Sequence, residues 1–324
     1  MTAQGFDMAE RLAYLRRFGG QALSYSTLQP EMDYFDVDGV GYLAYQVKFG
    51  RRFVLGDPVC APEDRPRLIE RFLAQDKGAV FLPVQLDSAR VLHEAFGLFA
   101  TQVGCETRLD LDRWSPRGRR MRNFRRAAHH ARRQGVMVAE EPAADPDEIR
   151  RVSMAWRHGR TLRTRWLKFV SRPVEVDPAA GVRRFLARAD GNLVGYVLFD
   201  PIFEDGRVTG YGPSVSAFTP EFRNGLFYLI VEQAARAFRN EGIASVNLGL
   251  SPLDIVAPAQ PFESRPLRYG LAGLRLTGDR LYNFSGLSFI KRKFYGEQVP
   301  VFAAHRAKLP ALDLFGFLRL SAII

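Results

Sequence analysis

Polar side chains cluster after a helix–strand unit predicted within residues 222–254. An apolar face at helical spacing predicts a helix over about 220–240, and the apolar run that follows predicts a strand over 244–250. The turn after this strand is polar, and the point where a strand leaves its sheet is a frequent place for site residues. An ordinary amphipathic helix packed on a sheet accounts for the helix but not for the polar residues, which are Asn247, Ser251 and Asp254.

The start of the predicted helix carries Arg223, Asn224 and Gly225. In acetyltransferase-like folds, free backbone N–H groups at such a helix start hold the pyrophosphate of coenzyme A. Only Arg223 and Gly225 approximate the Arg-x-x-Gly-x-Gly loop of those enzymes, so the match is partial. All three residues are candidates for substrate binding.

A mixture of polar, basic and aromatic side chains lies within residues 281–296. Aromatic rings interleaved with basic groups suit a substrate that is amphiphilic or phosphorylated, whereas the alternative interpretation is a basic surface helix. The candidates for substrate binding are Asn283, Ser285, Lys291 and Lys293, and Tyr282 is a candidate hydrogen-bond donor.

Residues 113–135 contain nine arginines and no acidic residue, and we expect a helix that starts after Pro116 and ends at Gly135. The arginines fall on more than one face, so burying this helix would need anionic partners. Phosphates of tRNA or of anionic lipid fit such a surface, because phosphate contacts need no base readout. A solvated helix between domains is the alternative interpretation. The candidate phosphate contacts are Arg119, Arg120, Arg122, Arg125 and Arg126.

The elements that must position these residues alternate between strands and helices along a chain of 324 residues, 47% of them hydrophobic. A β-rich first half is expected over 1–112 and a second half of the same pattern over 136–308, joined by the arginine-rich helix at 113–135. Residues 309–324 are an apolar tail. We therefore predict an α/β (α+β) fold of two halves, each a mixed sheet flanked by helices.

The net charge of +11 predicts an anionic partner such as nucleic acid, a phospholipid headgroup or a phosphate-bearing cofactor. Cys60 and Cys105 form no CxxC motif and have no His cluster nearby, so neither a disulfide framework nor a metal site is predicted. No apolar run is long enough to span a bilayer, and the N-terminus lacks the apolar stretch of a signal peptide. We expect a cytoplasmic protein, either free or peripheral on the inner face of the membrane.

Several of these segments together resemble the C-terminal catalytic domain of phosphatidylglycerol lysyltransferases, the multiple peptide resistance factor family. Residues 224–226 and 247–253 (Asn-Leu-Gly-Leu-Ser-Pro-Leu) are similar to a helix–strand–turn stretch of that domain. Residues 282–287 (Tyr-Asn-Phe-Ser-Gly-Leu) and 291–294 (Lys-Arg-Lys-Phe) resemble its Phe-Ser-Gly-Leu and Phe-Lys-x-Lys-Phe signature.

Two features outside these segments extend the resemblance over most of the chain. Leu55-Gly56-Asp57-Pro58 looks like the family's Gly-Asp-Pro turn, which makes Asp57 a further candidate for substrate binding. The arginine-rich helix, with Asn123 inside it, takes the place of the family's basic helix. The resemblance implies two tandem halves of the GNAT (acetyltransferase-like) architecture, with the main site in the second half.

The family transfers an aminoacyl group from aminoacyl-tRNA to a lipid hydroxyl, so the resemblance implies an acyltransferase with a phosphatidylglycerol-type acceptor. One alternative is an N- or O-acyltransferase that uses acyl-CoA or acyl carrier protein on an amino-lipid or sphingoid acceptor. The other is a non-catalytic module that binds tRNA or a membrane. No tightly bound cofactor is expected.

Acyl transfer needs a base for the attacking nucleophile and hydrogen-bond donors for the oxyanion. Asp254 and Glu232 are the candidates for the base. There is no Gly-x-Ser-x-Gly elbow, and neither cysteine has a His partner by sequence, so direct transfer without a covalent enzyme intermediate is expected. The candidate hydrogen-bonding residues are Tyr211, Asn247, Ser251 and Tyr282.

The C-terminal tail is the last candidate surface. Leu312, Phe315, Leu318 and Ile323 recur at near-helical spacing, and Arg319 is the basic residue among them. This helix either packs against the protein's own core or docks on anionic lipid, helped by the net positive charge.

Overall fold

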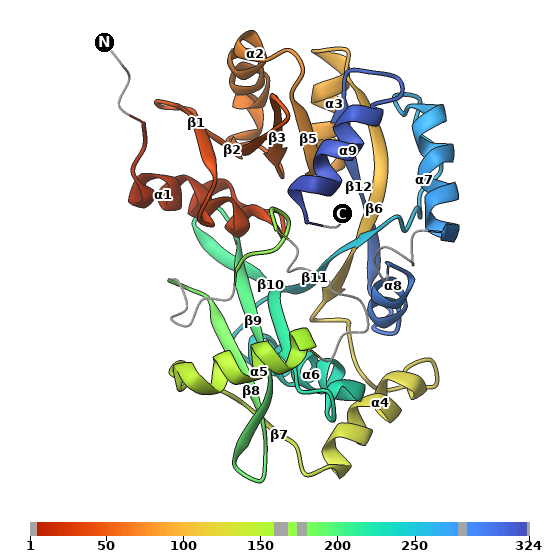
Figure 1. Cartoon of the computed structure of the whole chain (residues 1–324). Helices are drawn as coiled ribbons and strands as arrows, with labels where there is room; N and C mark the ends of the chain where they lie inside the picture. The colour runs from red at the N-terminus through yellow and green to blue at the C-terminus, as the bar shows by residue number, and fades with distance from the viewer. Residues whose placement is uncertain (1–4, 159–167, 174–179, 278–283, 323–324) are drawn as a thin grey trace.

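The computed structural model describes residues 5–158, 168–173, 180–277 and 284–322. Within these residues, one mixed sheet of twelve strands runs through two lobes (Figure 1). The strand order is β1-β2-β3-β5-β12-β6-β11-β10-β9-β8-β7, and β4 pairs with β2. The strands are β1 (Asp33–Val37), β2 (Gly41–Lys48), β3 (Arg51–Leu55), β4 (Val59–Cys60), β5 (Val80–Val84), β6 (Phe99–Asp110), β7 (Met137–Glu140), β8 (Arg183–Ala189), β9 (Asn192–Glu204), β10 (Arg207–Phe218), β11 (Ser245–Pro252) and β12 (Glu297–His305).

The first lobe has helices on both faces of its strands. On one face, α2 and α3 bury residues one turn apart, such as Leu68 and Phe72, against Val54 and Phe81 of the sheet. The other face is covered by α1, from the start of the chain, and by α9, from its end. Leu15 of α1 is fully buried. The helices are α1 (Met8–Phe18), α2 (Arg65–Gln75), α3 (Leu86–Glu94) and α9 (Ala311–Leu320), with short 3-10 helices at Ser24–Leu28 and Pro62–Asp64.

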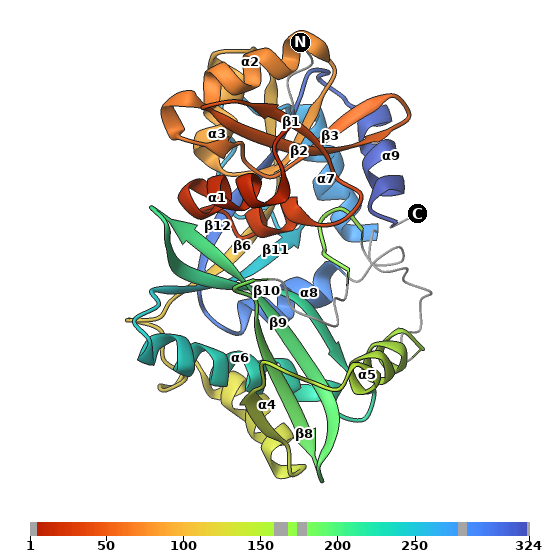
Figure 2. The ribbon, with the colours of Figure 1, turned by 90° about the vertical axis from the view of Figure 1, so that its left-hand side faces the viewer.

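The second lobe is also layered. Helix α5 covers one face of β8–β10, with Ile149 and Val152 packed against Tyr196, while α6 and α4 cover the other face (Figure 2). Helices α7 and α8 pack on β6 and β11, where the two lobes meet. The remaining helices are α4 (Arg122–Arg133), α5 (Pro146–His158), α6 (Arg223–Asn240), α7 (Arg265–Thr277) and α8 (Phe284–Arg292).

Both lobes contain the same connection. Strand β3 leads through α2 to β5, which runs parallel to β3, and β10 leads through α6 to β11, which runs parallel to β10. Antiparallel strands precede each parallel pair. The predicted fold class is therefore confirmed: the protein has mixed α/β architecture with tandem GNAT-like halves.

Strands β6 and β12 are exchanged between the lobes. Strand β6 follows β5 in the chain, but it pairs with β11 and β12. Strand β12 follows β11, but it lies between β5 and β6. The predicted boundaries at 112 and 136 fall on either side of α4, yet the sheet continues across both lobes, so the division into separate domains stays a prediction.

Two local expectations differ from the structure. The arginine-rich helix begins at Arg122 rather than after Pro116, because residues 118–121 form a bend followed by a turn. Strand β11 extends to Pro252, because its pairing with β6 continues past the expected end at 250.

Candidate active site

The parallel strands β10 and β11 separate soon after they meet. Among the described residues they pair at two positions, the second of which joins Tyr211 to Val246. Beyond it, a bulge between Asn247 and Leu250 interrupts the pairing of β11 with β6. Gly249, within this bulge, has a φ of +74°, which residues with a Cβ atom rarely adopt. The bulge turns the polar groups of β11 toward the centre of the molecule.

At this bulge a buried hydrogen bond joins β11 to β6, one of the two strands exchanged between the lobes. The Asn247 side-chain amide donates to Glu106 Oε2 at 2.7 Å, and its oxygen accepts from the Gly249 backbone N–H at 2.9 Å. Glu106 is completely buried on β6. Among the described residues no donor reaches its second oxygen, Oε1. The two hydrogen bonds therefore fix the orientation of the Asn247 amide, while the Glu106 Oε1 atom stays available to accept a hydrogen bond.

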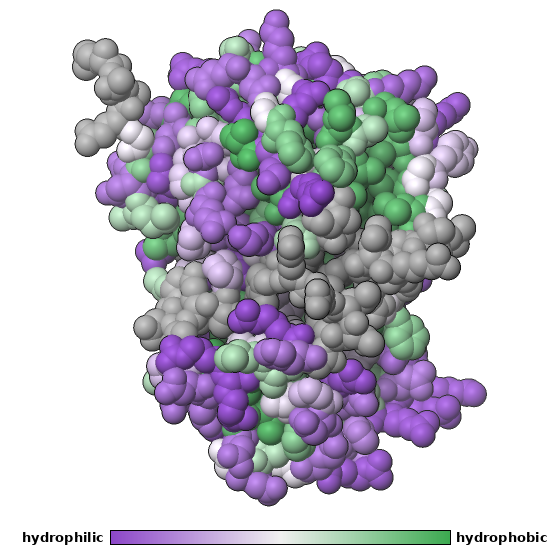
Figure 3. Space-filling view, in the orientation of Figure 1, coloured by the Kyte–Doolittle hydropathy of each residue, from purple (hydrophilic) through white to green (hydrophobic). Residues whose placement is uncertain are grey.

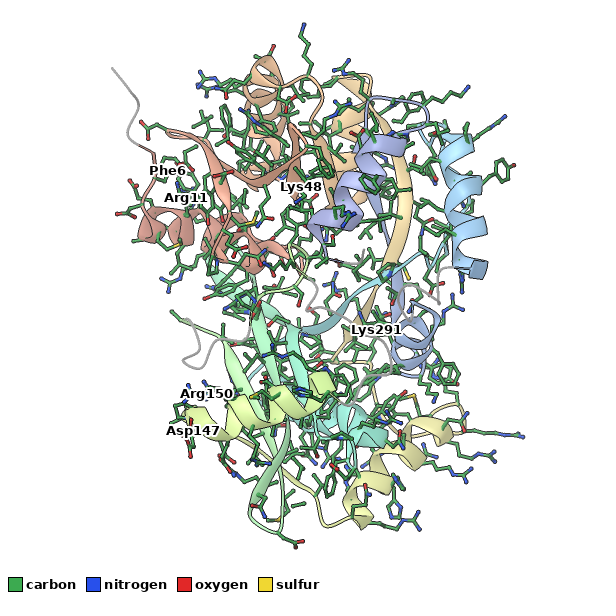
Figure 4. All side chains as sticks on the ribbon, in the orientation of Figure 1. Phe6, Arg11, Lys48, Asp147, Arg150 and Lys291 are labelled. Carbon is green, nitrogen blue, oxygen red and sulfur yellow. The ribbon has the colours of Figure 1, made fainter. Side chains whose placement is uncertain are left out.

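Lys291 of α8 approaches the same bulge from the other side. Its ammonium nitrogen donates to the Leu250 carbonyl oxygen at 2.7 Å, and its side chain is buried. Figure 4 shows it at the junction of the two lobes, beside α8. Burial lowers the pKa of Lys291 to about 8, although the negative charge of Glu106 opposes this effect. A lysine with this pKa exchanges a proton readily near neutral pH.

Glu106 acts on Lys291 through its negative charge. Burial raises the pKa of Glu106 to about 7, while the Asn247 hydrogen bond and the Lys291 charge lower it and the charge of Asp57 raises it. Sequence reasoning did not select Glu106. The signal that could have found it is an acidic residue in the middle of an apolar strand, since a buried carboxylate needs a compensating partner.

Asp57, on the turn after β3, brings the first lobe to the site. The turn begins at Gly56, whose φ is +73° and whose missing Cβ would lie 2.6 Å from the Gln21 side-chain oxygen. Asp57 accepts a hydrogen bond of 3.0 Å from the Gln85 backbone N–H, and burial raises the pKa of its carboxyl group. The charge of Asp57 raises the pKa of Glu106, and Glu106 and Lys291 act on each other's pKa.

Asp254 joins α7 and α8 to the end of β11. Its carboxylate accepts hydrogen bonds from Ser288 and Arg292 of α8 and, at 3.0 Å, from Arg275 of α7. Burial alone would raise the pKa of Asp254, but the hydrogen bonds from Ser288 and Arg292 and the arginine charges lower it overall. The network fixes the helix that carries Lys291.

An apolar cavity of about 320 Å³ opens beside Lys291, between the lobes. Asn247, Gly249 and Lys291 form its polar end, and α7, α9 and β5 supply aliphatic walls. Figure 3 shows apolar surface over α9 and between α9 and α7. A cavity of this size and composition suits the apolar part of a ligand. Its apolar lining includes Leu267, Leu271, Leu274, Leu314, Phe317 and Leu318.

Two other predicted catalytic residues lie away from the cavity. Tyr211 stacks on Phe238 with ring centroids 4.4 Å apart, and burial raises the pKa of its hydroxyl. Glu232, on α6, pairs with Arg132 at 2.8 Å and with Arg236 at 3.0 Å. Asn247 and Lys291 thus both line the cavity, whereas Tyr211 and Glu232 do not.

The remaining candidates on β11 and α8 are only partly described. Ser251 is buried on β11, and among the described residues its hydroxyl has no hydrogen-bond partner. Tyr282 and Asn283 lie outside the described residues, and only the backbone of Ser285 is described, at the start of α8.

The start of α6 is covered by α4. Gly225 has a φ of +89°, and a Cβ atom there would lie 2.1 Å from the Ala127 carbonyl oxygen. Arg223 and Asn224 are exposed beside it, and Asn224 interrupts the helical backbone. The helix start that would bind coenzyme A pyrophosphate in an acetyltransferase is therefore packed against another backbone.

Helix α4 has one apolar face and a basic remainder. Phe124, Ala128 and Ala131 are buried against α6, and the candidate arginines are exposed, on α4 and in the turn that precedes it. Arg125 donates to two carbonyl groups of the preceding turn at 2.7 and 2.8 Å. The exposed candidates are Arg119, Arg120, Arg122, Arg125 and Arg126.

The outer face of α8 and the turn after it continue this basic surface. The Lys293 nitrogen lies 4.0 Å from the ring centroid of Phe289, which is exposed, and the Arg120 guanidinium lies 5.7 Å from the ring centroid of Tyr295. Lys293 does not line the cavity, whereas Lys291 does. The two lysines of the Lys-Arg-Lys-Phe segment therefore face different environments.

Neither cysteine supplies a thiolate to this site, although Cys105 lies near Lys291 and Asp254. Burial raises the pKa of Cys60 and of Cys105 to about 12, so neither is a thiolate near neutral pH. Across the described ranges, no three His, Cys, Asp or Glu side chains gather as metal ligands would.

The sequence profile described as "Phosphatidylglycerol lysyltransferase, C-terminal" matches residues 12–305. The chain belongs to this family. It is 26% identical over 308 residues to the phosphatidylglycerol lysyltransferase of Bacillus subtilis (strain 168), a match that covers 92% of this chain and 35% of the relative. The chain thus spans about a third of the length of this curated relative.

Two solved structures share the family fold over nearly the whole chain. A DUF2156 C-terminal domain from Agrobacterium fabrum superposes with a TM-score of 0.80 and 20% identity, covering 98% of this chain and 97% of that one. L-PGS from Bacillus licheniformis superposes with a TM-score of 0.78 and 21% identity, covering 99% of both. Both chains therefore share the architecture of this family member.

Proposed function

We propose that this chain transfers an aminoacyl group from aminoacyl-tRNA to the hydroxyl of a phosphatidylglycerol-type lipid. The observation that carries the proposal is the position of Lys291, a buried amine at the polar end of an apolar cavity. Acyl chains fit among the leucines of α7 and α9, and the headgroup hydroxyl then lies beside Lys291 and Asn247. The similarity to the phosphatidylglycerol lysyltransferase of Bacillus subtilis supports this acceptor.

The transfer needs no covalent intermediate. The lipid hydroxyl oxygen forms a bond to the ester carbonyl carbon of the aminoacyl group, and the ester bond to the tRNA ribose oxygen breaks. The proton of the lipid hydroxyl must end on that ribose oxygen. The neutral amine of Lys291 takes this proton and returns it to the leaving oxygen, because a pKa of about 8 suits both steps.

The other residues prepare this proton transfer. Glu106 balances the charge of Lys291 when the amine is protonated, and the Asn247 amide holds the carboxylate in place. The Gly249 bulge lets Lys291 reach the strand backbone. Asp254 acts as a positioning residue, because its ion pairs with Arg275 and Arg292 hold α8 in place.

The positive charge of the surface around α4 supports aminoacyl-tRNA as the donor. Exposed arginines and the aromatic and basic groups at the end of α8 suit an RNA backbone and its terminal bases. The same helix argues against acyl-CoA, because Ala127 lies against the α6 start where the pyrophosphate would bind. Aminoacyl-tRNA is therefore the donor that the chain's charges favour over a thioester.

Mass spectrometry of lipids tests the proposal. Cells that produce the protein should contain phospholipid whose mass is increased by an amino acid, and the mass shift identifies that amino acid. The Lys291→Ala variant should abolish this product, while Lys77→Ala, which changes an exposed lysine, should retain it. Lipids that stay unchanged in the presence of folded wild-type protein would instead indicate a non-catalytic tRNA- or membrane-binding module.

A further inference from the structure

An exposed apolar patch lies on the far side of α9 from the cavity. Leu312 is 77% exposed and Phe315 44% exposed, and the Phe315 ring stacks on Phe49 at the tip of the β2–β3 hairpin, with centroids 5.7 Å apart. Phe49 itself is 65% exposed, and Val47 beside it is 50% exposed. We call these residues, together with Leu309, the α9 patch. Large exposed apolar groups that gather in this way mark a contact surface.

The α9 patch is built as one unit from two distant segments. The Arg51 guanidinium of the hairpin pairs with Asp313 of α9 at 3.2 Å. Gly316 is buried, and a Cβ atom there would lie 2.9 Å from the Phe53 ring, so the helix backbone rests directly on β3. These contacts fix Phe49 and Phe315 side by side.

Basic side chains surround the patch. Lys48 lies over the Phe49 ring at 5.5 Å, and Arg319 lies over the Phe315 ring at 5.6 Å. Residues 47–52 and 306–320 carry a single acidic residue, Asp313, which is buried and paired. The cations of these segments are Lys48, Arg51, Arg52, Arg306, Lys308 and Arg319.

We infer that the α9 patch docks the protein on an anionic phospholipid bilayer, with Leu312 and Phe315 inserted among the lipids. Aromatic and aliphatic groups surrounded by lysine and arginine have the composition that binds the interface of an anionic membrane. A symmetric contact with a second copy of this chain would instead bring the same cations against one another. The charge pattern therefore selects the membrane.

Docking in this orientation would place the cavity at the bilayer. The opposite face of α9 lines that cavity through Leu314, Phe317 and Leu318, so a single helix separates the inserted residues from the proposed acceptor site. A lipid would then pass from bilayer to cavity without crossing water. The inference rests on the proposed function only in taking the acceptor from a membrane.

Flotation with vesicles tests the inference without tRNA or transfer. Wild-type protein should float with phosphatidylglycerol–phosphatidylcholine vesicles and not with pure phosphatidylcholine vesicles. Leu312→Ser and Phe315→Ser should each weaken binding about tenfold, because each removes one large apolar side chain from the bilayer. Met137→Ser is the matched control, because Met137 is also 77% exposed but lies on β7 in the other lobe.

The charge requirement is tested with Lys308→Gln and Arg319→Gln, each of which should weaken binding about fivefold at low salt. Thermal unfolding of every variant verifies that it is folded. Equal flotation of Leu312→Ser, Phe315→Ser and wild type, or equal binding to neutral and anionic vesicles, would overturn the inference. Transfer to detergent-dispersed lipid should be unchanged in Leu312→Ser, so a failure of docking is distinguishable from a failure of the proposed activity.

Discussion

The Glu106 carboxylate and the Asn247 amide, 141 positions apart in the chain, meet at 2.7 Å in the centre of the sheet. Glu106 belongs to a strand that follows the first lobe, and Asn247 to a strand of the second. The hydrogen bond fixes the amide beside Lys291, so the polar end of the cavity depends on both lobes at once. This relationship underlies the first two predictions.

Replacing Glu106 by Gln should change how stability depends on pH. In the folded protein the pKa of Glu106 rises from 4.5 to about 7, so between these values the folded state binds more protons than the unfolded state. Its contribution to the free energy of unfolding therefore falls as pH rises through this window, by about 3 kcal/mol at most. Denaturant unfolding from pH 4.5 to 8 should show this loss in wild type relative to Glu106→Gln. Parallel curves for the two proteins would contradict the assignment.

Replacing Lys291 by Ala should lower the transfer rate about a hundredfold or more, the usual effect of losing a proton-transferring group. In wild type, the neutral amine is the active form, so the rate should rise with pH, reach half its maximum near pH 8 and level off above it. Initial rates with aminoacyl-tRNA and dispersed lipid measure both effects. A rate that falls as pH rises through 8 would show that the ammonium form is required instead.

Replacing Asp254 by Asn should weaken the attachment of α7 and α8. Two half-exposed arginines would lose their buried counter-charge, at a cost of about 1–3 kcal/mol in unfolding free energy. Transfer should fall, while the midpoint of its pH dependence should stay near pH 8, because Asp254 positions Lys291 and does not move the proton. Hydrogen exchange should increase in α8. Loss of the pH dependence would identify Asp254 as the base.

Replacing Leu271 by Trp should obstruct the cavity. Leu271 is buried on the inner face of α7, and the larger ring should displace acyl chains and cost about 1–3 kcal/mol in stability. We expect a larger loss of transfer with long-chain lipid than with a short-chain analogue. Tyr269→Trp, at a position 76% exposed on the same helix, is the control. Equal losses with both lipids would rule out the cavity as the acyl site.

Replacing Arg119, Arg122 and Arg126 together by Gln should weaken tRNA binding. Each lost phosphate contact should reduce the slope of log affinity against log salt, so three should reduce it by about 2 to 3. The control changes the same charge in the first lobe, at the exposed residues Arg16, Arg17 and Arg67. Similar slopes for both triple variants would place tRNA elsewhere.

The sequence indicated candidate site residues where periodicity located an element and polar side chains stood at its end. The helical period indicated α6, the apolar run after it indicated the strand β11, and the polar residues on and after that strand made Asn247 and Asp254 candidates. Glu106 escaped notice, because a carboxylate within a strand gives no sign of the partner that will be opposite it. The burial of Lys291 was equally hidden, since it depends on how α8 lies against a bulge in β11.

The exposed face and the cavity face of α9 also could not be assigned from the sequence. Periodicity in the C-terminal tail selected Leu312, Phe315 and Leu318 as one face, but the structure divides them between the exterior and the cavity. Only the fold brings Phe49 beside Phe315, because the two belong to opposite ends of the chain. Contacts of this kind depend on tertiary arrangement rather than on local propensity.

The exchange of β6 and β12 determines which motions the molecule can use. Because each strand belongs by sequence to one lobe and by hydrogen bonding to both, the lobes cannot swing apart without breaking the centre of the sheet. In the proposed transfer, access to the cavity would then depend on local movement of the helices that line it, α7, α8 and α9. The shared sheet would stay rigid while only these helices move.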